Sequence, residues 1–180
     1  MSKVFLDMAV SLDGFISGPN NSDGGLHDWC FAETGKSETV LEELQSGIGA
    51  MILGARAFGT SPDGFDTPYK IPHFVLTHHA RATVNRDGAQ FIFVTDGIQS
   101  ALERARAAAG DRDVCVAGGA ETAQQFLRAG LLDEIQLHLI PVLLGGGVRL
   151  LEHLDTPIKL ERVRVLEAPL ATHLRYRVLK

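Results

Sequence analysis

The sequence predicts an α/β protein in which helices cover both faces of a largely parallel sheet. Short apolar runs of strand length recur along the chain, and segments with helical periodicity separate them. The chain then ends on two alternating segments that are typical of an antiparallel hairpin. A length of 180 residues suits one domain, which we expect to span residues 1–180.

The apolar runs are rich in β-branched and aromatic residues, and glycine or polar residues bound them. Continuous apolar runs of this length are typical of strands that are buried on both faces of a parallel sheet. Segments 159–166 and 172–179 should add the antiparallel hairpin at one edge. In chain order, the runs that we expect to form the buried strands are 3–10, 50–53, 74–77, 91–95, 114–117 and 134–140.

Three segments between these runs have helical patterns. Ser37 is a residue type that caps helix N-termini, and the apolar stripe after it predicts a helix that ends at Gly47 and Gly49. The alanine-rich stretch 98–109 predicts a second helix. A third is predicted over residues 121–129, with a glycine directly after it.

Residues 11–29 are rich in Gly, Asn, Asp and Ser and show little periodicity, so we expect a long loop there. Loops of this length inside compact domains are usually lids or binding loops. The sequence therefore predicts that this segment takes part in function.

Composition excludes several kinds of partner. The 17 Lys and Arg against 22 Asp and Glu give a net charge of −5, so we expect no nucleic-acid partner. No apolar run reaches the ~18 residues that span a bilayer, and no leader pattern is evident, so we expect a cytoplasmic protein without a membrane partner. Cys30 and Cys115 form no zinc motif, and we expect no metal. Cys115 lies in an apolar run and should be a small buried hydrophobe.

The segment 117–122, Ala-Gly-Gly-Ala-Glu-Thr, follows a predicted strand and precedes a predicted helix. Glycines there let the backbone approach a ligand, and the free N–H groups of a helix start favour phosphate. The spacing is not that of the Rossmann fingerprint, because the third glycine is missing. A tight strand-to-helix turn that merely needs glycine is the alternative.

Two further turns follow predicted strands. Residues 53–58 offer a glycine and then a cation, and residues 76–81 offer hydroxyl, imidazole and guanidinium groups. Ligands of open α/β sheets bind beyond the carboxyl ends of the strands, so one dinucleotide could contact all three turns. For His78 and His79 a solvated polar turn is the alternative, and metal binding is disfavoured because no other ligand accompanies the pair.

The sequence resembles the C-terminal reductase domain of the bacterial riboflavin-biosynthesis deaminase-reductase and its stand-alone dihydrofolate reductase-like relatives. The resemblance runs over the whole chain, and its specificity lies in the order of the motifs. These motifs are Ser-Leu-Asp-Gly-Phe-Ile (11–16), Ile-Leu-Gly-Ala-Arg (52–56), Gly-Gly-Ala (118–120), Ala-Gly-Leu-Leu-Asp-Glu-Ile (129–135) with His138 and Pro141 after it, and Leu-Leu-Gly-Gly-Gly (143–147).

That resemblance implies a three-layer αβα sandwich with a mostly parallel sheet, and NADPH bound along the carboxyl ends of its strands. It also implies a cis peptide bond between the two glycines of the turn. The implied cofactor contacts are Ala9 and Ile16 beside the nicotinamide, Gly54 and Arg56 at the phosphates, Leu76, Thr77 and His78 at the adenosine end, and Gly118, Gly119, Ala120, Glu121 and Thr122 around the pyrophosphate.

The chain departs from the family pattern in two places. Ala55 stands where the family usually has a basic residue, so Arg56, His78 or Arg81 would have to meet the 2′-phosphate of NADPH. No carboxylate matches the acid that protonates the pterin in dihydrofolate reductases. Asp28, Glu33 and Glu38 lie in the corresponding stretch and are better explained as surface carboxylates, so no catalytic residue is assigned.

The resemblance implies an NADPH-dependent oxidoreductase that reduces a small heterocycle: a riboflavin-precursor pyrimidine, as in 5-amino-6-(5-phosphoribosylamino)uracil reductases, a pterin or a flavin. The alternative is a non-catalytic dimeric scaffold that has lost cofactor binding. We expect a homodimer in either case, with the alternating residues Leu174, Tyr176 and Val178 offering an apolar face. The run 143–147 lacks the Lys-Ser/Thr of a phosphate loop and is a connection or a dimer contact.

Overall fold

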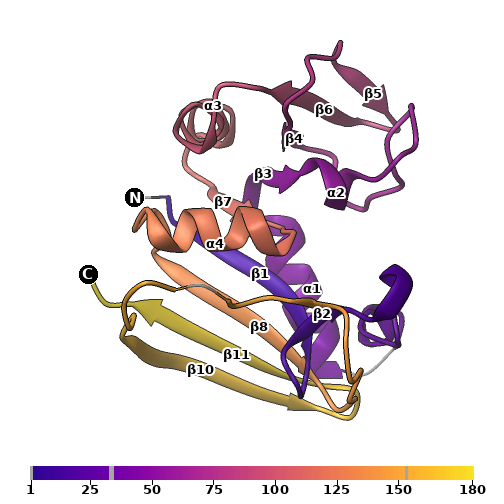
Figure 1. Cartoon of the computed structure of the whole chain (residues 1–180), viewed down its shortest axis with the longest axis vertical. Coiled ribbons are helices and arrows are strands. Elements are labelled where there is room, and N and C mark those ends of the chain that lie inside the picture. Colours follow the sequence, from indigo (N-terminus) through magenta and orange to yellow (C-terminus); the bar gives the residue numbers. More distant parts are fainter. Residues whose placement is uncertain (1, 33–34, 153) are drawn as a thin grey trace.

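A computed structural model describes residues 2–32, 35–152 and 154–180. Its described residues form a nine-stranded sheet in the order β10-β11-β8-β1-β7-β3-β4-β6-β5 (Figure 1). The six strands from β8 to β6 pair in parallel, while β11, β10 and β5 join through antiparallel pairs. The bounds are β1 (Val4–Ser11), β3 (Ile48–Gly54), β4 (Pro72–Leu76), β5 (Val84–Arg86), β6 (Ala89–Val94), β7 (Asp113–Val116), β8 (Glu134–Ile140), β10 (Leu160–Ala168) and β11 (Ala171–Val178).

Helices lie on both faces of the sheet, which confirms the predicted sandwich. Figure 1 shows α4 (Ala120–Arg128) in front of β1 and β8, with α1 (Gly35–Gly47) behind them. The helix α3 (Ile98–Ala109) shares the core of α4, and α1 packs on a separate core with Trp29. Alternate residues of β1 enter the two cores, since Leu6 faces α3 and α4 while Phe5 faces α1. None of the described helices is long and apolar enough to cross a membrane.

The strongest apolar patterns predicted their elements well, because α3 and β8 have the predicted bounds. Cys115 is fully buried, as expected. The N-cap prediction for Ser37 is wrong: α1 begins at Gly35, and Ser37 is buried inside its first turn. Gly49 does not end the helix but lies in β3, where an added Cβ would sit 2.7 Å from the backbone of Ala109.

The predicted loop 11–29 contains short elements that the sequence did not reveal. A strand β2 (Phe15–Ser17) pairs with β9 (Val148–Arg149), and two single 3-10 turns, η1 (Pro19–Asn21) and η2 (Asp28–Cys30), follow it. The short helix α2 (Ala55–Phe58) was also not predicted. Such elements carry too few residues for a periodicity to be visible.

The glycine-rich run 143–147 is tied to this loop, which supports its interpretation as a connection. The carboxylate of Asp13 accepts hydrogen bonds from the Ser11 hydroxyl (2.6 Å) and from the backbone N–H groups of Leu144 (3.1 Å) and Gly145 (2.7 Å). These bonds, that of Ser11 first, lower the pKa of Asp13 to about 2. An added Cβ on Gly147 would sit 2.0 Å from the Ser17 carbonyl oxygen, so only glycine fits.

The residues that we expected to form an apolar dimer face are not the exposed ones. Leu174, Tyr176 and Val178 are half-buried in β11, an interior strand of the sheet. The edge strand β10 carries the exposed apolar side chains instead, among them Val163 and Val165.

Candidate functional site

The carboxyl ends of β3 and β7 meet at the glycine turn. The backbone N–H of Ala117 donates to the carbonyl of Ile52 (2.9 Å), and the N–H of Gly54 donates to the carbonyl of Gly118 (2.8 Å). The peptide bond between Gly118 and Gly119 is cis, as the resemblance implied. The parallel register of the two strands therefore brings the segments 53–56 and 118–122 together.

Different constraints act on the two glycines of the turn. Gly118 has a φ of +98°, and an added Cβ would lie 2.8 Å from the sulfur of Met8, so the fold itself excludes a side chain there. Gly119 has an ordinary φ, and an added Cβ would meet no atom within 4 Å. Open space therefore lies beside Gly119, where a ligand can approach the backbone.

The helix α4 presents an open N-terminus at this space. Gly119 is the N-cap residue, and no side chain caps the helix. The N–H groups of Ala120, Glu121 and Thr122 belong to the first turn, which has no intrahelical acceptor for them. Such a terminus favours an anion. The side chain of Glu121 is exposed, so its contribution to an anion site comes from its backbone N–H.

Gly54 packs directly against Thr122, since an added Cβ on Gly54 would lie 2.7 Å from the buried Thr122 hydroxyl. Arg56 follows on α2 with an exposed side chain and makes no hydrogen bond or ion pair within the described ranges. Of the predicted site residues, Gly54 and Gly118 to Thr122 are thus brought together.

The turn after β4 lies beside α2. Leu76 and Thr77 are half-buried and His78 is exposed, while the Thr77 hydroxyl accepts from the N–H of His79 (3.1 Å). The guanidinium of Arg81 stacks over the rings of Phe93 (4.5 Å) and Phe58 (5.4 Å) and donates to the Pro62 carbonyl (3.0 Å). Arg81 is therefore held by contacts within the protein, whereas Arg56 has no such partner among the residues that the structure describes.

Ala9 and Ile16 lie on opposite sides of the sheet. Ala9 is buried in the core under α1, and Ile16 packs against the core under α3 and α4. The carboxyl end of β1 lies between them, since this strand ends at Ser11.

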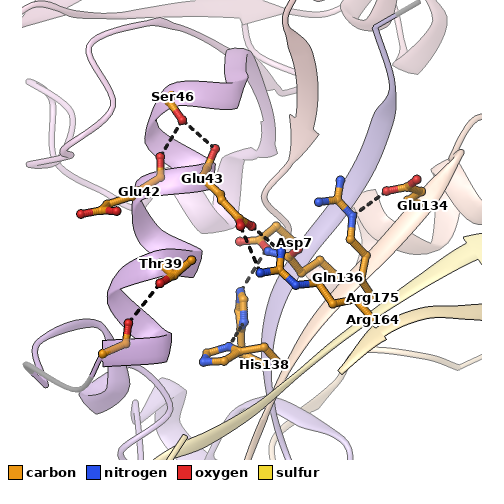
Figure 2. A network of polar contacts seen from close by, with 12 residues as sticks. Asp7, Thr39, Glu42, Glu43, Ser46, Glu134, Gln136, His138, Arg164 and Arg175 are labelled. Carbon is orange, nitrogen blue, oxygen red and sulfur yellow. Dashed lines mark hydrogen bonds and ion pairs between the residues drawn. The ribbon is translucent and has the colours of Figure 1, made fainter. Parts of the chain in front are cut away.

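Sequence reasoning missed a buried polar cluster on the α1 face. Asp7 Oδ1 accepts from the side-chain amide of Gln136 (3.0 Å) and lies 3.0 Å from His138 Nε2 (Figure 2). The Nδ1 atoms of His138 and His173 are 2.7 Å apart, and His173 Nε2 lies 3.2 Å from the Ser37 hydroxyl. His138, His173 and Ser37 are each less than 5% exposed.

Trp29 covers this cluster. Its ring centroid lies 4.2 Å from that of His138 and 4.9 Å from that of His173, and its buried indole Nε1 has no hydrogen-bond partner among the described residues. Burial, and then the neighbouring His138, lowers the pKa of His173 to about 4. Burial also raises the pKa of Cys30 to about 11 and that of Tyr69 well above its usual range, with the charge of Asp7 adding to both.

A signal for this cluster was present in the sequence. Asp7 interrupts the apolar run 3–10, and Gln136 and His138 interrupt the run 134–140 at alternate positions. The register of β1 and β8 pairs Asp7 with Gln136 and Ala9 with His138, which places these side chains on one face. Polar residues at alternate positions of buried strands predict a site only when the strands are known to be neighbours.

The carboxylates considered from the sequence lie outside the cluster. Asp28 is exposed on η2, and Glu38 is exposed on α1. Glu33 falls outside the described residues. The placement of the first two agrees with their interpretation as surface carboxylates.

Comparison of the sequence with known protein families identifies a family match over most of the chain. The model of the RibD C-terminal domain matches residues 2–173. YyaP, an uncharacterized protein of Bacillus subtilis, is 29% identical over 170 residues, which cover 89% of this chain and 86% of that protein.

Solved structures share the fold. A putative riboflavin biosynthesis protein from Shewanella sp. PV-4 has a TM-score of 0.75 at 22% identity, with 99% of each chain covered. Dihydrofolate reductase from Enterococcus faecalis, complexed with NADP(H), has a TM-score of 0.66 at 15% identity, with 99% of this chain and 97% of that one covered. Together with the match over nearly the full length, these folds show that the chain belongs to the RibD C-terminal domain family and has the dihydrofolate reductase-like fold.

Proposed function

We propose that the protein is an NADPH-dependent oxidoreductase that reduces a small heterocycle of the riboflavin-precursor pyrimidine, pterin or flavin type. The observation that carries this proposal is the open glycine turn. Gly54, Gly118 and Gly119 meet beside an uncapped helix N-terminus, and the space next to Gly119 is free of protein atoms. Membership of the family supports a reductase activity.

The residues of the turn fit the diphosphate of a dinucleotide. The N–H groups of Ala120, Glu121 and Thr122 would hold the pyrophosphate, with the close approach that Gly119 permits. A bound NADPH supplies a hydride from its nicotinamide ring, and the protein supplies position and a pocket closed to water. The nicotinamide would lie at the end of β1, flanked by Ala9 and Ile16.

The 2′-phosphate of NADPH needs a cation in the neighbouring turns. Arg56 is exposed two residues after Gly54 and makes no hydrogen bond or ion pair with the described residues, which favours it for this role. Leu76, Thr77 and His78 would border the adenosine end, with Leu76 and Thr77 half-buried and His78 exposed. Ala55 carries no charge, so discrimination between NADPH and NADH rests on Arg56.

Nucleotide binding tests this proposal directly. Trp29 is the one tryptophan of the chain, so its fluorescence should change on titration with NADPH, with a dissociation constant in the roughly micromolar range that is typical of such sites. NADH should bind more weakly. Oxidation of NADPH should follow addition of 5-amino-6-(5-phosphoribosylamino)uracil. Dihydrofolate and FMN should be tested in the same way, as representatives of the pterin and flavin classes.

Two outcomes would contradict the proposal. Absence of binding for both nucleotides at about 1 mM, above the affinity range of working sites, would favour the non-catalytic scaffold. Tighter binding of NADH than of NADPH would overturn the cofactor assignment and leave the reductase reaction open to test with NADH.

A further inference from the structure

One oxygen of the Asp7 carboxylate is free. Oδ1 contacts both Gln136 and His138, while Oδ2 has no hydrogen-bond partner in the described part of the chain. The Asp7 side chain is 18% exposed, and its Oδ2 atom is not fully buried. Oδ2 is therefore accessible from solvent and able to contact a ligand.

The other end of the cluster is buried. From Oδ1 the contacts run in series through His138 and His173 to the hydroxyl of Ser37, all of them buried. The described residues contain no group of three side chains arranged to hold a metal ion, so this series is a hydrogen-bonded chain and not a ligand set.

The contact between the two imidazoles restricts where protons can be. Only one of the two Nδ1 atoms, 2.7 Å apart, carries a proton. When His138 donates from Nε2 to Asp7 and is neutral, its Nδ1 is bare and must accept from His173. The Nε2 of His173 is then bare as well, and it accepts from the Ser37 hydroxyl.

One added proton reverses every bond in the series. A proton that arrives at Nε2 of His173 displaces the Nδ1 proton to His138, whose Nε2 proton passes to Oδ1 of Asp7. The added proton can rest on an imidazole beside the Asp7 carboxylate, or it can reach Asp7, which leaves a protonated Asp7, two neutral imidazoles and His173 donating to Ser37. The geometry thus allows proton entry at His173 to appear as a carboxylic acid at Asp7.

The surroundings suit such a transfer. A cavity of about 10 Å³ lies against His173, roughly the size that one water needs, and Gln136 and Arg164 help to line it. Arg164 is paired with Glu43 of α1 (Figure 2). The titratable and charged groups that face Asp7 and the two imidazoles are Cys30 of η2, Tyr69 before β4, Cys115 of β7, Arg164 of β10 and Arg175 of β11.

These neighbours do not compete for the proton. Burial raises the pKa values of Cys30, Tyr69 and Cys115, so all three stay neutral around pH 7. The lowered pKa of His173 keeps its imidazole neutral there, which lets it both accept and pass on a proton. The remaining partner, Arg175, is held by Glu134 through an ion pair of 2.5 Å.

Asp7 also lies where a substrate of the proposed reductase would be. It is two residues from Ala9 on the same face of β1, and strand geometry puts the two α-carbons about 7 Å apart. Ala9 is the residue that we place beside the nicotinamide. A ring stacked on the nicotinamide from the α1 side would come within reach of Oδ2.

We propose that Asp7 donates the proton that accompanies hydride transfer, and that His138 and His173 are positioning residues that return a proton to it. This inference rests on the proposed reductase function. A bound dihydronicotinamide would supply a hydride to the carbon of a C=N or C=C bond and would be oxidised by this loss. The Asp7 carboxyl receives the relay proton on Oδ1, turns about its Cβ–Cγ bond to bring this oxygen to the substrate, and gives the proton to the other atom of the double bond. The resulting carboxylate regains a proton from His138, which His173 supplies in turn from water.

Trp29 reports on the series without any substrate. A protonated imidazole beside an indole quenches its fluorescence, so the emission of Trp29 should fall in an acid titration as His173 takes up a proton. Asp7→Asn keeps the shape but removes the negative charge that favours the imidazolium, so the midpoint should move to lower pH by about one unit. Asp28→Asn, an exposed carboxylate next to Trp29, should leave the midpoint in place.

Turnover tests the donation itself, with NADPH and 5-amino-6-(5-phosphoribosylamino)uracil as the probe. Asp7→Asn should lower kcat by about 10²- to 10⁴-fold, the usual contribution of general acid catalysis, while the NADPH dissociation constant stays the same. His173→Gln should lower kcat less and move the pH profile of kcat. Asp28→Asn should keep the wild-type kcat.

The outcomes separate the two proposals. Equal fluorescence midpoints in the wild type and Asp7→Asn, or a wild-type kcat in Asp7→Asn, would overturn the proton relay while the reductase function stands. A wild type that neither binds NADPH nor turns over the probe would overturn the reductase function. In that case the Trp29 titration still decides whether Asp7 exchanges protons with the two imidazoles.

Discussion

Arg56 and Arg81 come from neighbouring turns but are in different surroundings. The guanidinium of Arg81 stacks over Phe93 and Phe58 and donates to a backbone carbonyl, so moving it toward a phosphate would break these contacts. Arg56 has no such contacts to lose in the described part of the protein. At the scale of single residues, the structure therefore favours Arg56 as the cation that selects NADPH.

Arg56→Ala should weaken NADPH binding and leave NADH binding nearly unchanged. A charge-assisted hydrogen bond to phosphate contributes roughly 1.5–3 kcal/mol, which is about one to two decades in affinity. Trp29 fluorescence with both nucleotides measures this ratio. Arg112→Ala, an exposed arginine before β7, is the matched control and should change neither affinity.

Two results would reassign these arginines. Equal losses for NADPH and NADH in Arg56→Ala would place the residue at the pyrophosphate and not at the 2′-phosphate. Arg81→Ala should lower the melting temperature, because the stacking is lost, without changing the ratio of the two affinities. A changed ratio would show that Arg81 also contacts the 2′-phosphate.

At the scale of elements, the strand-to-helix turn between β7 and α4 separates a folding requirement from a binding requirement. Gly118 is fixed by its positive φ and by Met8, whereas Gly119 has an ordinary backbone conformation and open space beside it. Two adjacent glycines therefore give different mutational outcomes.

Gly119→Val should abolish NADPH binding and leave the protein folded, because the new side chain fills the space next to the helix N-terminus and meets no protein atom. Gly47→Val is the matched control, since Gly47 is also exposed with no atom within 4 Å of an added Cβ. Gly118→Ala should lower the melting temperature instead. NADPH binding that survives in Gly119→Val would show that the turn is structural only.

At the scale of the whole molecule, one edge of the sheet carries exposed apolar side chains among charged ones. The strand β10 is the edge, and Leu160, Val163 and Val165 on it are each at least 40% exposed. Edge strands with exposed apolar residues are where proteins associate through their sheets. We therefore propose that the protein forms a homodimer and that β10, not the residues of β11, provides the contact.

Light scattering at micromolar concentration should give twice the chain mass of 19.4 kDa. Val165→Lys should give the monomer mass, because a charge at the edge strand opposes association. Leu143→Lys changes a more exposed apolar residue, which lies in the glycine-rich connection, and should leave the dimer intact. A wild type of monomer mass would reject the dimer, and loss of the dimer only in Leu143→Lys would place the contact at the connection.

The sequence by itself determined the buried strands, the three long helices and the glycine turn, because each depends on patterns within a few neighbouring residues. The run 134–140 and the stretch 98–109 are examples in which apolar composition and length were sufficient. The order of the family motifs then indicated the sandwich and the position of a dinucleotide. Short elements such as β2 and β9 could not be predicted, since each is stabilised by a partner about 130 residues away.

Only the tertiary structure decided which polar side chains meet. Asp7, His138 and His173 lie in three separate segments, and each alone looks like an interruption of an apolar strand. The pairing of β1 with β8 and of β8 with β11 puts them on one face, and a shift of register by one residue would separate them. Strand order and register arise from packing of the whole sheet, so no local pattern in the sequence contains them.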